Sequence, residues 1–135
     1  MRPILAITMG DPAGIGSEIA VKALDQPAIY ERCVPIIIGD TAAIADAVRF
    51  CGRSHLTLNE IHDPTEAKGT YGTLDTINLG LLEPNGWQYG KVQQNCGEAA
   101  FQYVKHAIEL ALAGKVHGTV TGPINKEAIN LAGYH

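Results

Sequence analysis

The residues with the clearest chemical potential lie in a glycine-rich stretch from Thr8 to Glu18, which carries two carboxylates. The stretch follows a short apolar run and precedes an amphipathic segment, an order that predicts a strand, a tight loop and the start of a helix. Gly10, Gly14 and Gly16 then lie where the backbone must bend sharply or approach another group closely. We therefore treat this loop, with Asp11 at its centre, as a candidate binding surface.

The spacing of these glycines, G-x-x-x-G-x-G, differs from both common phosphate-binding fingerprints. A dinucleotide fingerprint requires G-x-G-x-x-G, and a P-loop requires a lysine directly before Ser17, where Gly16 stands. Asp11 and Glu18 would also repel a phosphate held at the start of the helix. We expect contacts to hydroxyl, amide or cofactor groups instead. The alternative is an ordinary strand-to-helix turn, in which the glycines only permit positive φ and Glu18 only complements the helix dipole.

A second candidate loop, Thr121 to Lys126, follows another short apolar run about a hundred residues later. Gly122 begins a predicted turn, Thr121 and Asn125 could hydrogen-bond a substrate, and Lys126 could meet a phosphate or a carboxylate. Alternatively, Thr121 and Asn125 cap the turn and Lys126 is a solvated charge. If the two preceding strands are parallel neighbours, both loops lie beyond their carboxyl ends and line a single cleft.

The other elements that the pattern predicts make up an α/β fold, with flanking helices on a parallel or mixed sheet. Thr41 is the expected N-cap of one helix, with Gly52 just after its end, and Pro27 to Arg32 is expected to be a break. The expected strands are 3–7, 34–38, 56–61, a short one within 74–82, and 116–121, and the expected helices are 19–24, 42–50, 95–113 and 127–133.

Residues 62–92 are rich in glycine and proline, so we expect them to be mostly irregular, with a turn at Pro84-Asn85-Gly86. The pattern does not indicate which strand the short strand of this region would pair with. Trp87 and Tyr89 are expected to pack over an edge of the core, and anchoring of their loop is favoured over a role as a ligand platform.

Composition favours one domain over residues 1–135, without an internal boundary, and a small-molecule partner. The net charge is −4 and no cluster of Lys or Arg is present, which argues against nucleic acid or an anionic membrane surface. Three cysteines without short spacing indicate reduced thiols, and no apolar run suits export or a membrane span, so we expect a cytoplasmic protein. The five histidines are too scattered to predict a metal site, and no Ser/His/Asp arrangement is supported.

The two loops resemble those of the 4-hydroxythreonine-4-phosphate dehydrogenase family. The segments that carry the resemblance span essentially the whole chain; they are Met9–Gly16, Gly90–Val92, Gly97–Ala100, Thr121–Lys126 and Ala128–Gly133. The resemblance implies a fold like that of isocitrate and isopropylmalate dehydrogenases, which is α/β without the dinucleotide fingerprint, in agreement with the glycine spacing.

The resemblance implies an NAD-dependent enzyme, working as a homodimer with a divalent metal (zinc, magnesium or cobalt), that oxidises and decarboxylates a phosphorylated four-carbon hydroxy acid. The substrate would be 4-phosphohydroxy-L-threonine, in pyridoxal 5′-phosphate synthesis, or 4-phospho-D-threonate or 4-phospho-D-erythronate in a sister group. The run Ile124–Ala128 is slightly more similar to the sister group.

Matching to the family also implies that the catalytic residues, the metal ligands and the phosphate-binding basic residues fall beyond residue 135. We therefore expect the N-terminal portion of a larger dehydrogenase, inactive by itself, and assign no catalytic or metal-binding residue within the chain. His135 falls too early to match the family's substrate histidine. The alternatives are a non-catalytic α/β metabolite-binding fragment and an interaction remnant.

Overall fold

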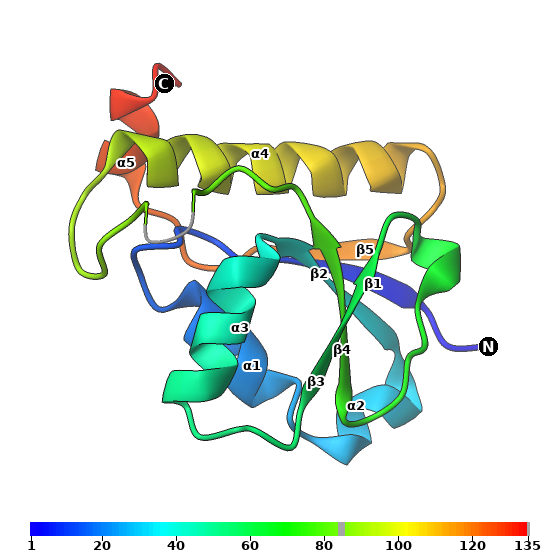
Figure 1. Cartoon of the computed structure of the whole chain (residues 1–135). Coiled ribbons are helices and arrows are strands. Elements are labelled where there is room, and N and C mark those ends of the chain that lie inside the picture. Colours follow the sequence, from blue (N-terminus) through cyan, green and yellow to red (C-terminus); the bar gives the residue numbers. More distant parts are fainter. Residues whose placement is uncertain (84–85, 135) are drawn as a thin grey trace.

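The computed structural model describes residues 1–83 and 86–134, in which five parallel strands are flanked by helices (Figure 1). The strands are β1 (Ile4–Thr8), β2 (Val34–Gly39), β3 (Thr57–Ile61), β4 (Thr73–Asn78) and β5 (Gly118–Val120), in the spatial order β3-β4-β2-β1-β5. Every pair of neighbours is parallel. The α/β class is confirmed, and the sheet is parallel rather than mixed.

The helices are α1 (Gly16–Ala23), α2 (Pro27–Arg32), α3 (Thr41–Phe50), α4 (Gln94–Leu112) and α5 (Lys126–Leu131). Helix α4 lies across one face of the sheet and contacts β1, β2 and β5, whereas α1 and α3 pack together on the other side (Figure 1). None of these helices, within the part of the chain that the structure describes, is long and apolar enough to cross a bilayer.

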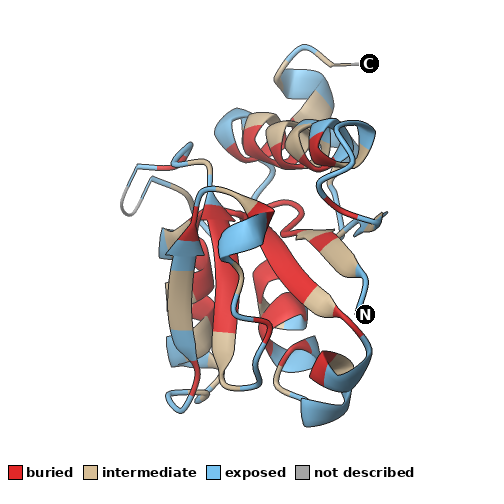
Figure 2. Ribbon diagram, turned by 90° about the vertical axis from the view of Figure 1, so that its right-hand side faces the viewer, coloured by how far each residue is buried: buried red, intermediate tan, exposed pale blue. Residues whose placement is uncertain are grey.

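The core is centred on β2, whose Ile36, Ile37 and Ile38 are all fully buried. A strand covered on both faces needs apolar side chains in succession rather than in alternation, and this explains the continuous apolar run that predicted it. Figure 2 shows the buried central strands and the buried underside of α4. Most buried residues of α4 are small, with Tyr103 and Leu110 as the large exceptions. Gly97 lets the backbone of α5 approach so closely that a β-carbon there would overlap the Ala128 carbonyl.

Two local predictions were wrong. The stretch from Pro27 to Arg32 is helix α2 rather than a break, because a proline at the first helical position lacks only an N–H that would be unpaired there anyway. Thr41 is the first residue of α3 and Asp40 precedes it as the N-cap. The Asp40 carboxylate instead accepts hydrogen bonds from Tyr103 Oη at 2.6 Å and from the Leu82 N–H at 2.9 Å.

The region 62–92 holds more regular structure than its composition predicts. Its strand, β4, lies inside the sheet between β3 and β2, and a short 3-10 helix spans Pro64–Glu66. The start of the predicted turn, Pro84-Asn85, lies outside the described residues, as does His135. Gly52 follows the end of α3 with a φ of 67°, as predicted.

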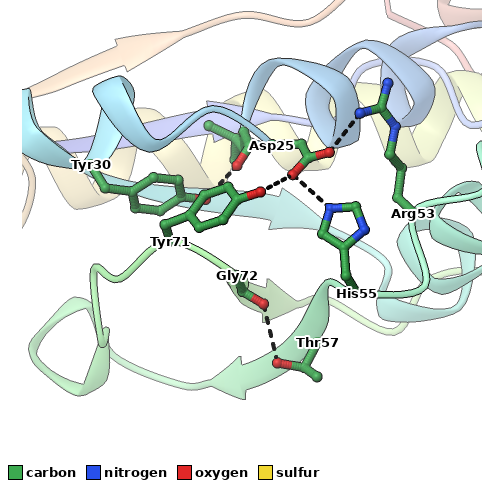
Figure 3. A network of polar contacts seen from close by, with 8 residues as sticks. Asp25, Tyr30, Arg53, His55, Thr57, Tyr71 and Gly72 are labelled. Carbon is green, nitrogen blue, oxygen red and sulfur yellow. Dashed lines mark hydrogen bonds and ion pairs between the residues drawn. The ribbon is translucent and has the colours of Figure 1, made fainter.

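A polar network around Asp25 (Figure 3) joins three connections, because Asp25 follows α1, Arg53 and His55 precede β3, and Tyr71 precedes β4. The Asp25 side chain is 4% exposed and meets Arg53 Nη1 at 2.6 Å, Tyr71 Oη at 2.7 Å and His55 Nε2 at 2.9 Å. The hydrogen bonds from His55 and then Tyr71 are the main reasons that the pKa of Asp25 is lowered from 3.8 to about 2.

We predict that Asp25→Asn destabilises the protein by about 2 kcal/mol at pH 7, because charge-assisted hydrogen bonds are lost while the exposed partners can regain water. A carboxyl with a lowered pKa stabilises the fold above its ordinary value, and that stabilisation is lost as the pH falls from 3.8 to about 2. Unfolding curves recorded from pH 7 down to pH 2 should therefore converge for the two proteins. Equal stability at pH 7 would contradict this role.

Candidate functional site

The two candidate loops cross at the carboxyl ends of β1 and β5, which are parallel neighbours as the sequence argument required. The Asp11 N–H donates to the Pro123 carbonyl at 2.8 Å. The Gly122 N–H donates both to the Thr8 carbonyl at 3.1 Å and to Thr8 Oγ1 at 3.0 Å. These bonds hold the loops against each other, so they share one rim of the sheet.

Backbone crowding requires glycine at three of the site positions: Gly10 and Gly122 where the two loops cross, and Gly16 within the first loop. A β-carbon at Gly10, where φ is +80°, would overlap the Pro123 carbonyl oxygen, and one at Gly16 would overlap the Met9 carbonyl oxygen. A β-carbon at Gly122 would lie 2.5 Å from the Thr8 carbonyl oxygen. Close backbone approach therefore accounts for these three positions without a ligand. The alternative drawn from the sequence invoked only positive φ, which among these three Gly10 alone has.

The crossing loops form one side of a cleft of about 290 Å³. The residues that line it come from three segments; they are Asp11, Ala13, Gly14, Ile15, Gly90, Lys91, Val92, Pro123, Ile124 and Asn125. These segments lie together at the left of Figure 1, where the dark blue, yellow-green and orange loops meet. The cleft thus has the position that ligand sites take in open parallel sheets, beyond the carboxyl ends of the strands.

Asp11 is the buried acid of this cleft, with 4% of its surface exposed. Its Oδ1 accepts a hydrogen bond from the Ala13 N–H at 2.8 Å. Burial raises the pKa of the Asp11 carboxyl, and the Ala13 hydrogen bond opposes this only in part. A desolvated carboxyl in a cleft can accept a hydrogen bond or a proton from a ligand hydroxyl, and perturbed acids of this kind gather at functional sites.

Two polar residues of the second loop, Asn125 and Lys126, line different hollows. Asn125 lines the cleft, and its Oδ1 also accepts from the Ala128 N–H at 3.0 Å, so the predicted capping role is present. Lys126 lines a separate hollow with Phe101 and Tyr134, whose rings stack. The phosphate contact predicted for Lys126 stays a prediction.

Thr121 lies outside the cleft, as do Gly16 and Gly122. All three line an apolar hollow of about 230 Å³ between α1 and the open edge of β5. Their predicted contacts with a ligand also stay predictions.

The third wall is a loop that sequence reasoning did not include among the site residues. The Gly90 N–H donates to the Ala13 carbonyl at 2.8 Å, which joins this loop to the first one. Tyr89 packs edge-to-face on Phe50 and Trp87, and its hydroxyl donates to Asp46 Oδ2 at 2.8 Å. The predicted anchoring role of Trp87 and Tyr89 is therefore present. The signal in the sequence that could have identified this loop was the resemblance of Gly90-Lys91-Val92 to the family.

The volume of the cleft and the metal-ligating side chains of the described residues bear on which groups could bind here. Ligand sites usually measure roughly 300 to 1,000 Å³, so this cleft has room for a small metabolite or for one part of a cofactor. Across residues 1–83 and 86–134, no group of three or more His, Cys, Asp or Glu side chains is placed to hold a metal. Cys96 is buried near Asp11, and burial raises the pKa of its thiol to about 11, which keeps it neutral.

A parallel sheet with a cleft beyond the carboxyl ends of its strands defines an open α/β protein, the class in which ligands bind at that edge. Residues 31–135 match the family described as "Pyridoxal phosphate biosynthetic protein PdxA". This is more than half of the chain, and the chain belongs to the PdxA family.

Curated relatives cover nearly the whole chain. A Symbiobacterium thermophilum protein with the provisional name D-threonate 4-phosphate dehydrogenase is 50% identical over 131 residues, which are 97% of this chain and 39% of the relative. The D-threonate 4-phosphate dehydrogenase of Cupriavidus necator is 41% identical over 132 residues, which are 98% of this chain and 39% of the length of that relative. The chain thus spans about two fifths of the length of these relatives.

A solved structure gives the same fold. The crystal structure of a 4-hydroxythreonine-4-phosphate dehydrogenase from Burkholderia phymatum superposes with a TM-score of 0.95 at 39% identity, over 99% of this chain and 40% of that one. The expected isocitrate dehydrogenase-like fold is therefore confirmed.

Proposed function

We propose that this chain forms one wall of the active site of an NAD-dependent, metal-dependent dehydrogenase that oxidises and decarboxylates a 4-phosphorylated four-carbon hydroxy acid. The observation that carries the proposal is the cleft around Asp11, which the two crossing loops help to line. It lies in a chain whose residues 31–135 match the PdxA family. The proposal also includes the homodimer and the cytoplasmic location expected from the family resemblance and the composition.

Among the phosphorylated acids, 4-phospho-D-threonate is the substrate we favour. The two curated relatives, at 50% and 41% identity, are both named for D-threonate 4-phosphate. The solved structure at 39% identity is named for 4-hydroxythreonine-4-phosphate, so that substrate is the natural competitor. The two acids differ at C2, where one bears a hydroxyl and the other an amino group.

In this proposal the chain contributes binding and proton handling. Bound NAD would supply the hydride acceptor. Asp11 would accept a hydrogen bond from a substrate hydroxyl, and the side-chain amide of Asn125 is available as a donor because its oxygen is used in the α5 cap. The apolar walls at Ile15 and Ile124 would keep water from the ligand. No step is assigned to a metal held by this chain.

The test is a steady-state assay of NAD reduction by the intact protein, with each phosphorylated acid as substrate, before and after treatment with a chelator. We expect turnover with a higher kcat/KM for 4-phospho-D-threonate than for 4-phosphohydroxy-L-threonine, lost with chelator and restored by a divalent metal. Binding of the acids without any turnover would contradict the enzymatic proposal and favour a metabolite-binding function.

A further inference from the structure

Lys91 is the positively charged residue of the cleft. Asp11 and Lys91 are the ionisable side chains among the residues that line it. Asp11 is buried, whereas Lys91 is exposed on the loop before α4. The ion pairs found in the described part of the chain do not include Lys91. Its charge is therefore free to meet an anion that enters the cleft.

The backbone that carries Lys91 is held in place. On one side of it, the Gly90 N–H bonds the Ala13 carbonyl of the first loop. Tyr89, one residue earlier, is fixed to α3 by Phe50 and Asp46. On the other side, Gln93 Nε2 donates to the Lys91 carbonyl at 3.1 Å. A lysine on an anchored backbone loses less freedom when it binds a ligand than one on a loose loop would.

Gly14 also lines the cleft, and the packing of the protein does not require a glycine at this position. A β-carbon at Gly14 would have the Asp11 carbonyl oxygen as its nearest neighbour at 3.5 Å, which is an ordinary contact. Its φ lies outside the left-handed region. Gly10 and Gly16 in the same loop would clash with backbone atoms. At Gly14, in contrast, the protein itself leaves room for a β-carbon, and this residue lines the cleft.

We propose that Lys91 binds a phosphate group of the ligand, with Gly14 leaving room for that ligand in the cleft. This assignment rests on the proposed function and adds to it a phosphate-binding residue within this chain. The negative charge of Asp11 disfavours phosphate beside the first loop, so the ligand would place its phosphate toward Lys91 and its hydroxyl toward Asp11. The phosphate could belong to the phosphorylated acid or to the pyrophosphate of NAD.

Kinetics of the intact protein with 4-phospho-D-threonate and NAD would test the assignment through Lys91→Gln, Lys91→Arg and Gly14→Ala. Loss of a charge-assisted hydrogen bond should raise the KM of the ligand whose phosphate Lys91 binds about tenfold to 100-fold in Lys91→Gln. The ligand whose KM rises identifies the source of the phosphate. Lys91→Arg should restore most of the affinity. Gly14→Ala should raise the same KM without lowering Tm. Lys105→Gln, an exposed lysine on α4, is the matched control.

A thermal shift with inorganic pyrophosphate separates this assignment from the proposed reaction, since it requires no turnover. We expect pyrophosphate to raise the Tm of the wild type and of Lys105→Gln, but not that of Lys91→Gln. If the wild type turns over neither acid but shows this pattern, the proposed function fails and the phosphate site stands. Equal KM values and equal thermal shifts in wild type and Lys91→Gln would overturn the assignment of Lys91 as a phosphate-binding residue.

Discussion

Asp11→Asn should lower kcat/KM of the intact protein about 100-fold, because a buried acid that handles a substrate proton commonly contributes a factor of that size. The same variant should be as stable as the wild type or more stable at pH 7. Asparagine can still accept the Ala13 hydrogen bond, and the substitution removes a carboxylate that burial disfavours. Parallel kinetics and thermal unfolding would measure both effects.

The pH dependence of stability separates Asp11 from Asp25. A carboxyl whose pKa is raised in the folded state destabilises the fold when it ionises, so the advantage of Asp11→Asn should disappear as the pH falls below the ordinary value of 3.8. Asp63→Asn, on the surface and paired with Lys115, is the matched control for activity. Wild-type kinetics in Asp11→Asn would show that Asp11 is only a loop-forming residue.

Gly16→Ala should destabilise the protein by about 3 kcal/mol or more, because overpacking against backbone atoms has few routes of relief. The new β-carbon would overlap the Met9 carbonyl oxygen at the end of β1, where neither the strand nor α1 can move alone. Chemical denaturation and thermal unfolding would measure the loss, and soluble expression itself should fall.

Gly14→Ala is the control for this effect, since it makes the same change two residues earlier in the same loop. Its β-carbon has an ordinary neighbour at 3.5 Å. Reduced freedom of the unfolded chain should leave its stability equal or slightly higher, by up to about 1 kcal/mol. If Gly16→Ala and Gly14→Ala were equally stable, the close approach of the start of α1 to the Met9 carbonyl would not hold in solution.

Much of the fold was predictable because its signals are local. The unbroken apolar run of β2 and the helical spacing of α4 both mark elements packed against the core, and burial explains each pattern. The prediction that the loops after β1 and β5 meet was conditional on strand order, which apolar patterns do not encode. The sheet supplies that order, with β1 and β5 side by side.

What the sequence did not predict depends on contacts between distant segments. The place of β4 inside the sheet follows from its pairing with β2 and β3, since its own residues are flanked by glycines typical of loops. Lys91 joins the cleft through the Gly90 hydrogen bond to Ala13, 77 residues away by their numbers. The predicted N-cap, Thr41, was one residue too late, and the bond that holds Asp40 comes from Tyr103 on α4, far away in the sequence.

The most direct measurement is a crystal structure of the intact protein with NAD and a phosphorylated four-carbon acid bound. The account predicts ligand density in the cleft, with a hydroxyl near Asp11, a phosphate near Lys91 and ligand atoms against Gly14. Density for both ligands elsewhere, with this cleft left to solvent, would contradict the assignment of the crossing loops as a wall of the active site.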